Sequence, residues 1–192
     1  GLKPRAIEFR ILRPDGTLRW IERHNTQSVS GTGEVLKIFA VERDITTQKE
    51  SDLRRQLQHS VTEVLAQGAA LPVTIRQILE ILARGLSSNV CAYWTAEKGL
   101  RSLRCMEVWQ RPESDMDDFV AASRVLTFSH GEGLGGCVLA SRESKFMTES
   151  DLLADGFQRR DAAKAAGIRT GGAFPIMLRG EIFGVIEFFT AE

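Results

Sequence analysis

The stretch GAFPIMLRGEIFGVIEFF, residues 172–189, decides the fold of this protein. It holds two apolar runs, 172–178 and 182–189, which are separated by the pair Arg179-Gly180. Apolar runs on either side of such a glycine-containing pair are typical of two strands joined by a tight turn. The stretch therefore predicts a β-hairpin.

A second hairpin is predicted closer to the middle of the chain. Residues 90–96 and 100–109 are rich in apolar and aromatic side chains, and Glu97-Lys98-Gly99 supplies turn chemistry between them. Strands joined by tight turns pair in antiparallel fashion, whereas parallel strands need longer crossover connections. The fold class we expect is therefore α+β, with a central antiparallel sheet flanked by helices.

Helical periodicity appears in the segments around these hairpins. Apolar residues at helical spacing predict a helix over 47–67 and a second helix over 71–86, with Gly68 and Pro72 between them. The apolar steps of the first helix fit a coiled-coil seam only with a shift of register, so a coiled coil and an ordinary amphipathic helix both remain open. Further elements are expected as helices at 116–123, 134–141 and 149–167 and as a strand at 125–129.

The first 46 residues predict a separate small sheet. Residues 7–11 alternate between apolar and charged side chains, and Arg13 to Thr17 carries turn chemistry. The cluster Ser30 to Gly33 then separates two further strand-like runs, 21–29 and 35–41. Three antiparallel strands are expected.

Composition limits the partners that this chain is expected to bind. Twenty-five basic residues balance twenty-five acidic ones, and no long block of one sign is present, so nucleic acid is not an expected partner. No apolar run approaches the roughly 20 residues that span a bilayer, and we expect a cytoplasmic protein without membrane contact. Cys91, Cys105 and Cys137 lack the spacing of a disulfide framework or a zinc site, which favours reduced thiols.

Two stretches near the beginning resemble a known family. EFRILRPDGTLRW at 8–20 and GEVLKIFAVERDITTQKE at 33–50 resemble the C-terminal strands of PAS domains, including the Asp-Ile-Thr ending. The resemblance assigns 1–46 to the C-terminal part of a PAS domain and 47–69 to a connecting signalling helix. It offers no ligand site, because the strands and helices that close a PAS cavity would precede residue 1.

The remainder of the chain resembles a GAF domain. The resemblance rests on GEGLGGCV at 131–138, AAGIR at 165–169, and FPI at 174–176 with GEIFGVIEFF at 180–189. It assigns 70–192 to a GAF domain that lacks the final helix of the family. Residues 131–136 also satisfy G-x-G-x-x-G, but a dinucleotide site requires a βαβ unit that the predicted order of elements lacks.

The resemblance implies a sensory role in bacterial signal transduction. Such domains bind a small ligand or sense redox state, form homodimers through their helices, and pass the signal to an effector. The effector expected outside this chain is a histidine kinase of a two-component system, or a cyclic-di-GMP enzyme such as a diguanylate cyclase or a phosphodiesterase. The alternative is a purely structural dimerisation module without a ligand.

Candidate ligand-binding residues follow from aromatic and reactive side chains in the GAF-like region. Aromatic side chains supply the apolar lining of a cavity, Arg169 is an anion partner, and Cys137 lies where a helix dipole would favour a thiolate. The competing interpretation of the aromatic residues is ordinary core. The candidates are Trp94, Trp109, Phe128, Cys137, Phe146, Phe157, Arg169 and Phe174.

A junction between the two parts is expected at Asp44 and Thr46. The Asp44 carboxylate is placed to cap the amides that follow Thr46, or to pair with Arg19 on the neighbouring hairpin. Either interaction would fix the direction in which the helix leaves the first sheet.

Catalytic residues, a metal site and a specific cofactor are not predicted. His24, His59 and His130 show no metal-binding spacing, and no nucleophile elbow, Walker loop or cyclase motif is present. No Cys-His pair supports bilin attachment, and EFFTAE replaces the motif typical of cyclic-nucleotide GAF domains. Nothing indicates haem or flavin, and we expect this chain not to be an enzyme.

Overall fold

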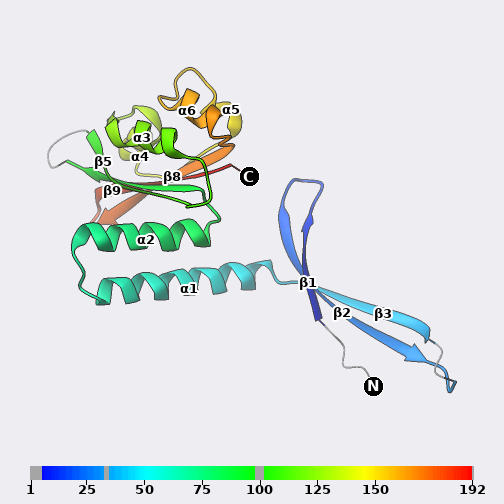
Figure 1. Ribbon diagram of the computed structural model, residues 1–192. Helices are drawn as coiled ribbons and strands as arrows, with labels where there is room; N and C mark the ends of the chain where they lie inside the picture. Colours follow the sequence, from blue (N-terminus) through cyan, green and yellow to red (C-terminus); the bar gives the residue numbers. More distant parts are fainter. Residues whose placement is uncertain (1–5, 33–34, 98–101, 192) are drawn as a thin grey trace. The chain divides into compact units, whose positions relative to one another are not determined.

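A computed structural model describes residues 6–32, 35–97 and 102–191 (Figure 1). The chain divides into two compact units, residues 1–58 and 59–192. The division falls inside the helix α1, Thr46–Ala66, which confirms the helix predicted at 47–67. The helix α2, Leu71–Gly85, follows after a turn in which Gly68 has a φ of 64°.

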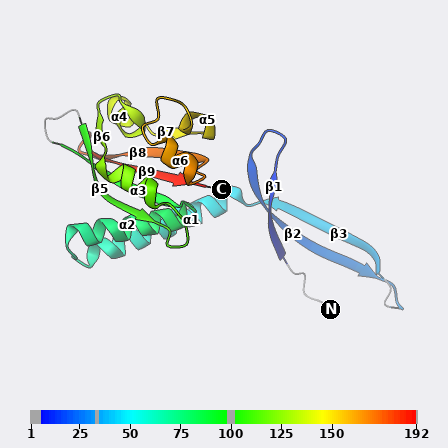
Figure 2. The ribbon, with the colours of Figure 1, turned by 45° about the horizontal axis from the view of Figure 1, so that its top comes forward.

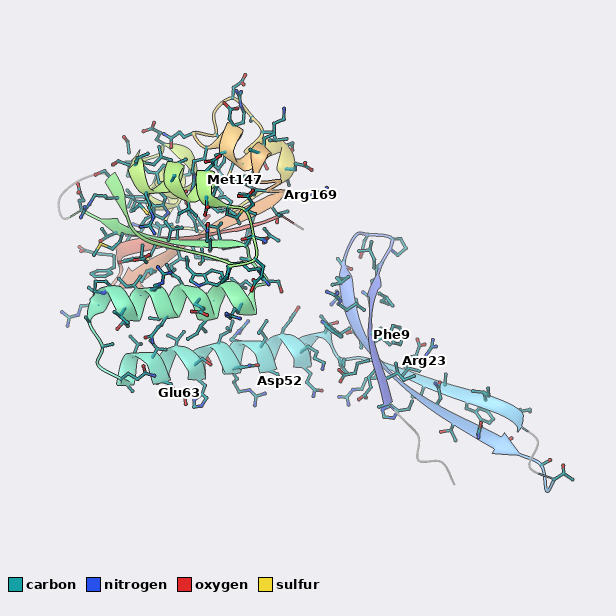
Figure 3. The ribbon with its side chains drawn as sticks, viewed as in Figure 1. Phe9, Arg23, Asp52, Glu63, Met147 and Arg169 are labelled. Atoms are coloured by element: carbon teal, nitrogen blue, oxygen red, sulfur yellow. The ribbon has the colours of Figure 1, made fainter. Side chains whose placement is uncertain are left out.

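The first unit contains an antiparallel sheet of three strands, as predicted. The strands β1, Ala6–Leu12, β2, Leu18–Val29, and β3, Val35–Asp44, lie in the order β1-β2-β3. The turn after β1 is closed by Asp15, whose Oδ1 accepts a hydrogen bond from the Thr17 amide at 2.8 Å. Across β1 and β2 the guanidinium of Arg23 lies 5.3 Å from the ring centre of Phe9 (Figure 3).

The second unit is built on an antiparallel sheet of six strands in the order β6-β5-β4-β9-β8-β7. The two predicted hairpins form its centre, because β4 pairs with β5 and β8 pairs with β9. The strands are β4, Val90–Ala96, β5, Ser102–Gln110, β6, Thr127–Ser129, β7, Lys145–Met147, β8, Thr170–Leu178, and β9, Glu181–Thr190. The expected turn at 97–99 lies largely outside the described residues.

Helices cover both faces of this sheet. The helix α2 lies along one face, and the shorter helices lie on the other (Figures 1 and 2). These are α3, Asp117–Val125, α4, Gly133–Ser141, α5, Glu149–Leu152, and α6, Arg160–Ala165. This arrangement confirms the expected α+β class with a central antiparallel sheet flanked by helices.

Each face of the sheet has its own core. Because side chains alternate along a strand, β4 sends Ala92 and Trp94 toward the short helices and Cys91 and Tyr93 toward α2. The larger core on the side of the short helices includes Leu103, Phe119, Phe128, Leu134, Val138, Leu152, Ile168, Val185 and Phe189. The smaller core on the side of α2 includes Leu79, Ala83 and Trp109.

One predicted helix was wrong. The segment 149–167 was expected to be a single helix, but it forms the two short helices α5 and α6. The apolar residues Leu152 and Phe157 are both buried, yet the exposed residues 153–156 form a turn between them. Tertiary burial therefore outweighs helix propensity here, because the chain must bend to bring both side chains into one core.

Another difference concerns the short edge strands. The strand β7 was not predicted, and β6 spans only Thr127–Ser129 instead of the expected 125–129. Strands of three residues leave too short a pattern of alternation to be recognised in the sequence. Both strands nevertheless pair at the two edges of the sheet, β6 with β5 and β7 with β8.

The glycine-rich segment after β6 lets backbone approach backbone. Gly136 lies in α4, and a Cβ atom there would lie 2.1 Å from the carbonyl oxygen of Ser129. Gly131 donates its amide hydrogen to the Gly136 carbonyl at 2.8 Å, which closes the loop on the helix. The predicted interpretation of this segment as a tight entry into a helix is confirmed.

We therefore expect Gly136→Ala to lower the free energy of unfolding by about 2 kcal/mol, although alanine favours helices, because the added methyl group meets rigid backbone. Gly156→Ala is the matched control, since a Cβ there meets nothing within 4 Å. Urea unfolding of both variants measures the effect. Equal midpoints for the two variants would contradict the close approach.

Candidate functional site

A charged pair lies inside the core between the sheet and the short helices. The Arg159 Nη2 atom donates to the Glu187 Oε2 atom at 2.8 Å, and their side chains are 1% and 0% exposed. Glu187 comes from the central strand β9, whereas Arg159 precedes the first turn of α6. Fully buried charges are rare in proteins unless they are paired, so this pair identifies the candidate functional site.

Two neutral groups complete the hydrogen bonding of the pair. The Trp94 indole Nε1 donates to the same Glu187 oxygen at 2.9 Å. The Arg159 Nη1 atom donates to the Ser123 hydroxyl at 2.9 Å, and this hydroxyl donates in turn to the Phe119 carbonyl at 2.8 Å. One guanidinium thus connects the strands β4 and β9 with the helix α3.

Aromatic rings enclose the guanidinium of Arg159. Five ring centres lie between 4.9 and 5.7 Å from its Cζ atom, close enough for cation–π attraction. We call these rings the Arg159 cage; they belong to Trp94, Phe119, Phe128, Phe157 and Phe189. They come from two central strands, an edge strand, a helix and the turn before α6, so only the folded unit brings them together.

The alternation of β9 explains how a carboxylate reaches this position. Val185, Glu187 and Phe189 share one face of the strand and are all fully buried there. Burial is the main influence on the Glu187 carboxyl and raises its pKa, while the Arg159 charge and the hydrogen bonds from Arg159 and Trp94 act in the opposite direction. The pair is therefore held by direct contacts against a large desolvation cost.

Hydrogen bonding at the pair is incomplete. Among the described residues, neither the Arg159 Nε atom nor the Glu187 Oε1 atom has a hydrogen-bond partner of good geometry. The Gly135 amide lies near the carboxylate and favours its ionised form. A buried ion pair is often no more stabilising than apolar side chains of similar volume, so stability alone does not account for it.

The structure brings together some of the predicted ligand-binding residues and separates others. Trp94, Phe128 and Phe157 meet in the Arg159 cage. Trp109 lies on the opposite face of the sheet, in the core beneath α2. Arg169 is exposed and lies away from the cage at the start of β8 (Figure 3).

Two further predicted residues, Phe146 and Phe174, also lie away from the cage. Their rings contact each other and Phe188, with centres 5.6 Å apart for Phe146 and Phe174 and 5.3 Å apart for Phe174 and Phe188. Phe188 points to the face of the sheet opposite Glu187, because the two residues are neighbours on β9. Phe146 is 65% exposed, so these rings do not join the enclosed cluster.

The central residues of the cluster, Arg159 and Glu187, were missed in the sequence. Glu187 offered a signal, because it interrupts an apolar strand at a position where alternation requires a buried side chain. Arg159 offered none, since the polar run Gln158 to Asp161 reads as solvated surface. Only the bend between α5 and α6 turns this arginine inward.

The three cysteines lie in different environments. Burial raises the pKa of the Cys91 thiol to about 12 and that of the Cys105 thiol to about 11. Cys137 is partly buried on α4, and its Sγ atom donates to the Gly131 carbonyl at 3.4 Å. Because the thiolate is the reactive form, the raised pKa values disfavour reaction of Cys91 and Cys105 at neutral pH.

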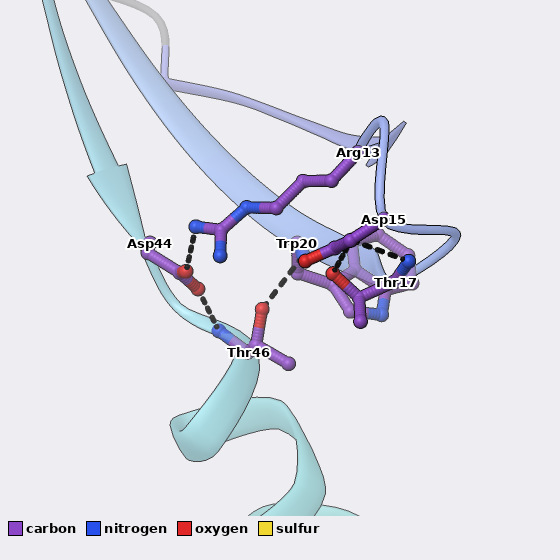
Figure 4. A network of polar contacts seen from close by, with 6 residues as sticks. All are labelled: Arg13, Asp15, Thr17, Trp20, Asp44 and Thr46. Atoms are coloured by element: carbon purple, nitrogen blue, oxygen red, sulfur yellow. Dashed lines mark hydrogen bonds and ion pairs between the residues drawn. The ribbon is translucent and has the colours of Figure 1, made fainter.

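The predicted junction at the start of α1 is a small hydrogen-bonded network (Figure 4). The Asp44 Oδ1 atom accepts from the amide of Thr46 itself at 3.0 Å, whereas the expected cap was to the amides that follow Thr46. The partner of the other Asp44 oxygen is Arg13 at 3.5 Å, and not Arg19. Arg19 lies one strand residue before Trp20, and its Nε atom has no partner among the described residues.

Thr46 connects the helix to the strand beside it. Its hydroxyl accepts a hydrogen bond from the Trp20 amide at 2.9 Å, and the Ile45 amide donates to the Trp20 carbonyl at 2.9 Å. Lys49, one turn later, pairs with Glu8 of β1 at 2.6 Å. These contacts fix the first turn of α1 on the three-stranded sheet of the first unit.

The described residues contain neither a metal-binding cluster nor a membrane helix. Over residues 6–32, 35–97 and 102–191, no three His, Cys, Asp or Glu side chains are placed to hold a metal ion. Of the helices in the same ranges, none combines the length and the apolar character needed to cross a bilayer.

The sequence and the fold were compared with those of known proteins. A family model described as GAF domain matches residues 70–190. A comparison with curated proteins gave no match to the sequence. Among solved structures, the nlh2 GAF domain of A. aeolicus in an inactive state is 17% identical over 73% of this chain and 80% of that one, with a TM-score of 0.58.

Two other solved structures share the fold at similar distance. The GAF domain of a phosphoenolpyruvate-protein phosphotransferase from Coxiella burnetii is 18% identical, covering 73% of this chain and 78% of that one, with a TM-score of 0.58. The free methionine-R-sulfoxide reductase of Neisseria meningitidis, in complex with its substrate, is 13% identical, with coverage of 75% and 76% and a TM-score of 0.55. At these identities the likenesses show the fold alone.

At the junction, we expect Thr46→Val to lower the free energy of unfolding of the first turn of α1 by about 1–3 kcal/mol, because the Trp20 amide loses its acceptor. Hydrogen exchange of the Trp20 amide measures the loss. Thr47→Val is the matched control, since Thr47 is an exposed neighbour on the same helix. Unchanged protection of Trp20 in Thr46→Val would contradict the network.

For the cysteines, we expect iodoacetamide at neutral pH to modify Cys91 and Cys105 at least about a hundredfold more slowly in the native protein than in urea, because raised thiol pKa values and burial both suppress the thiolate. Peptide mass mapping measures each site separately, and Cys137 serves as the partly buried comparison in the same sample. Rapid native modification of Cys91 would show that its environment is not the one described.

Proposed function

This chain belongs to the GAF domain family, and on that premise we propose that residues 59–192 are a sensory module that binds a small ligand at the Arg159 cage. The observation that carries the proposal is the buried pair Arg159–Glu187 inside five aromatic rings. An enclosed site lined mostly by aromatic side chains with a few converging polar groups is the usual form of a small-molecule site. The free methionine-R-sulfoxide reductase, whose substrate complex has the same fold, offers a parallel in the family.

The signal would travel through the sheet to α2. Trp94 of β4 contacts Glu187, while its neighbour Tyr93 packs on the opposite face in the core beneath α2. Close-packed cores transmit small displacements, so a shift of β4 at the cage displaces the contacts of α2. The proposal requires α2 to adopt two arrangements, of which the ligand favours one.

The wider role follows from the same premise. Residues 1–46 are proposed to be the C-terminal part of a PAS domain, and residues 47–69 a signalling helix that supports homodimers. The protein is proposed to act in the cytoplasm of a bacterium, upstream of a histidine kinase or a cyclic-di-GMP enzyme outside this chain. No reaction is assigned to the residues described.

A second candidate is a structural dimerisation module without a ligand. The observation that favours it is that the Arg159 side chain itself occupies the centre of the cage. In this alternative the buried pair serves only to hold α3, β4 and β9 together, and helix pairing carries the function. A binding experiment separates the two candidates.

We expect the purified chain to retain at least one compound when it is dialysed against a defined pool of polar metabolites and the retained compounds are measured by mass spectrometry. Glu187→Gln should weaken retention at least about tenfold, because it removes the carboxylate charge of the site while keeping its shape. Glu181→Gln, an exposed position on the same strand, should retain the compound fully. Retention of nothing by the folded wild-type chain would establish the structural alternative.

A further inference from the structure

We propose, as a step that rests on the ligand-binding function above, that the Arg159 cage is a site for organic cations of the guanidinium class, and that Arg159 is a tethered occupant that a free cation displaces. The cage recognises its occupant by features that fit any guanidinium group: aromatic faces, a carboxylate and a hydroxyl acceptor. Nothing in this set of contacts depends on the attachment of the guanidinium to α6.

The groups around the occupant are acceptors or electron-rich faces. Glu187 offers its carboxylate, Ser123 offers its hydroxyl oxygen, and the rings of the cage present surfaces that attract cations. The Trp94 indole donates to the carboxylate and thereby fixes its orientation toward the centre of the cage. An anionic ligand would meet the buried Glu187 charge, so the electrostatics favour a cation.

Arg159 uses only part of the hydrogen-bonding capacity of a guanidinium. Of the five N–H bonds of a guanidinium, the described contacts use one to Glu187 and one to Ser123. The Nε atom of Arg159 is buried without a hydrogen-bond partner. A free guanidinium is able to rotate and form the bidentate pair that carboxylates prefer.

The position of Arg159 in the chain permits its withdrawal. It stands before a helix of six residues and after the exposed turn 153–156, whereas most of the cage comes from the sheet and α3. Asp155 in this turn is 99% exposed, and a Cβ on Gly156 would meet no atom within 4 Å. Arg159 thus follows an exposed turn and lies outside the paired strands, so its displacement breaks no strand pairing, although Phe157 of the cage is two residues away.

Displacement of Arg159 predicts the direction in which removal of this side chain changes the affinity for a free guanidinium compound. When a resident group must be displaced, only the fraction of protein with a free site is able to bind the ligand. The smaller this fraction is, the weaker the apparent affinity becomes. Removal of Arg159 should then strengthen the binding of a free guanidinium compound. If Arg159 instead anchored a ligand, its removal would weaken binding.

We expect ethylguanidinium to bind Arg159→Ala at least about tenfold more tightly than wild type, as measured by calorimetric titration, and to raise the melting temperature of the variant with saturation. N-ethylurea, which has nearly the same shape without the charge, should do neither. Arg160→Ala is the matched control, because Arg160 is a half-exposed neighbour paired with Asp155 and Asp161. Arg159→Ser is the second variant if the alanine variant does not fold, because its small side chain also leaves the centre of the cage open.

The wild-type chain supplies an independent measurement. With arginine side chains labelled with ¹⁵N, the Arg159 signal should be displaced from those of exposed arginines by the five surrounding rings. Ethylguanidinium should return it to the exposed position, and N-ethylurea should leave it unchanged. If it stays in place and neither variant binds ethylguanidinium, the cation assignment is overturned; a metabolite retained in the dialysis experiment would then leave the ligand-binding function standing.

Discussion

The interaction on which the second unit depends is the buried ion pair between Arg159 and Glu187. A carboxylate on the central strand of a sheet has no water to solvate it, so a positive group must reach it from another part of the chain. The bend between α5 and α6 provides that group, and Trp94 and Ser123 hold the two charges in register. The helix α3 and the turn before α6 supply side chains that surround the guanidinium on this face of the sheet.

The sequence predicted the parts of the fold that are determined by local patterns. Apolar runs around a turn pair predicted the hairpin at Arg179-Gly180, and helical spacing of apolar residues predicted α1 and α2. All of these elements lie close to their predicted bounds. The segment 149–167 was misjudged because its two buried residues, Leu152 and Phe157, suit a helix locally and are brought together only by the rest of the core. Periodicity and turn residues carry no information about packing between distant parts of the chain.

The site was predicted less completely for a related reason. Trp94, Phe128 and Phe157 were recognised as candidates by their size, and their size does bring them into the core. Trp109, Phe146 and Phe174 have the same character and lie elsewhere, because the face of the sheet on which a side chain falls is fixed by strand register. Arg159 looked like surface in sequence, and no pattern in its neighbours distinguishes it from the exposed Arg160.

The place of β9 in the sheet bears on how the protein is made. It follows all the other described strands in the chain, yet it lies in the middle of the sheet between β4 and β8. Trp94 and Glu187, which meet across this strand pair, are 93 residues apart. During synthesis, most of the unit therefore emerges from the ribosome before its sheet can close, with apolar faces of β4 and β8 still uncovered. Pairing between segments so far apart in sequence is slow and leaves the incomplete sheet exposed to aggregation.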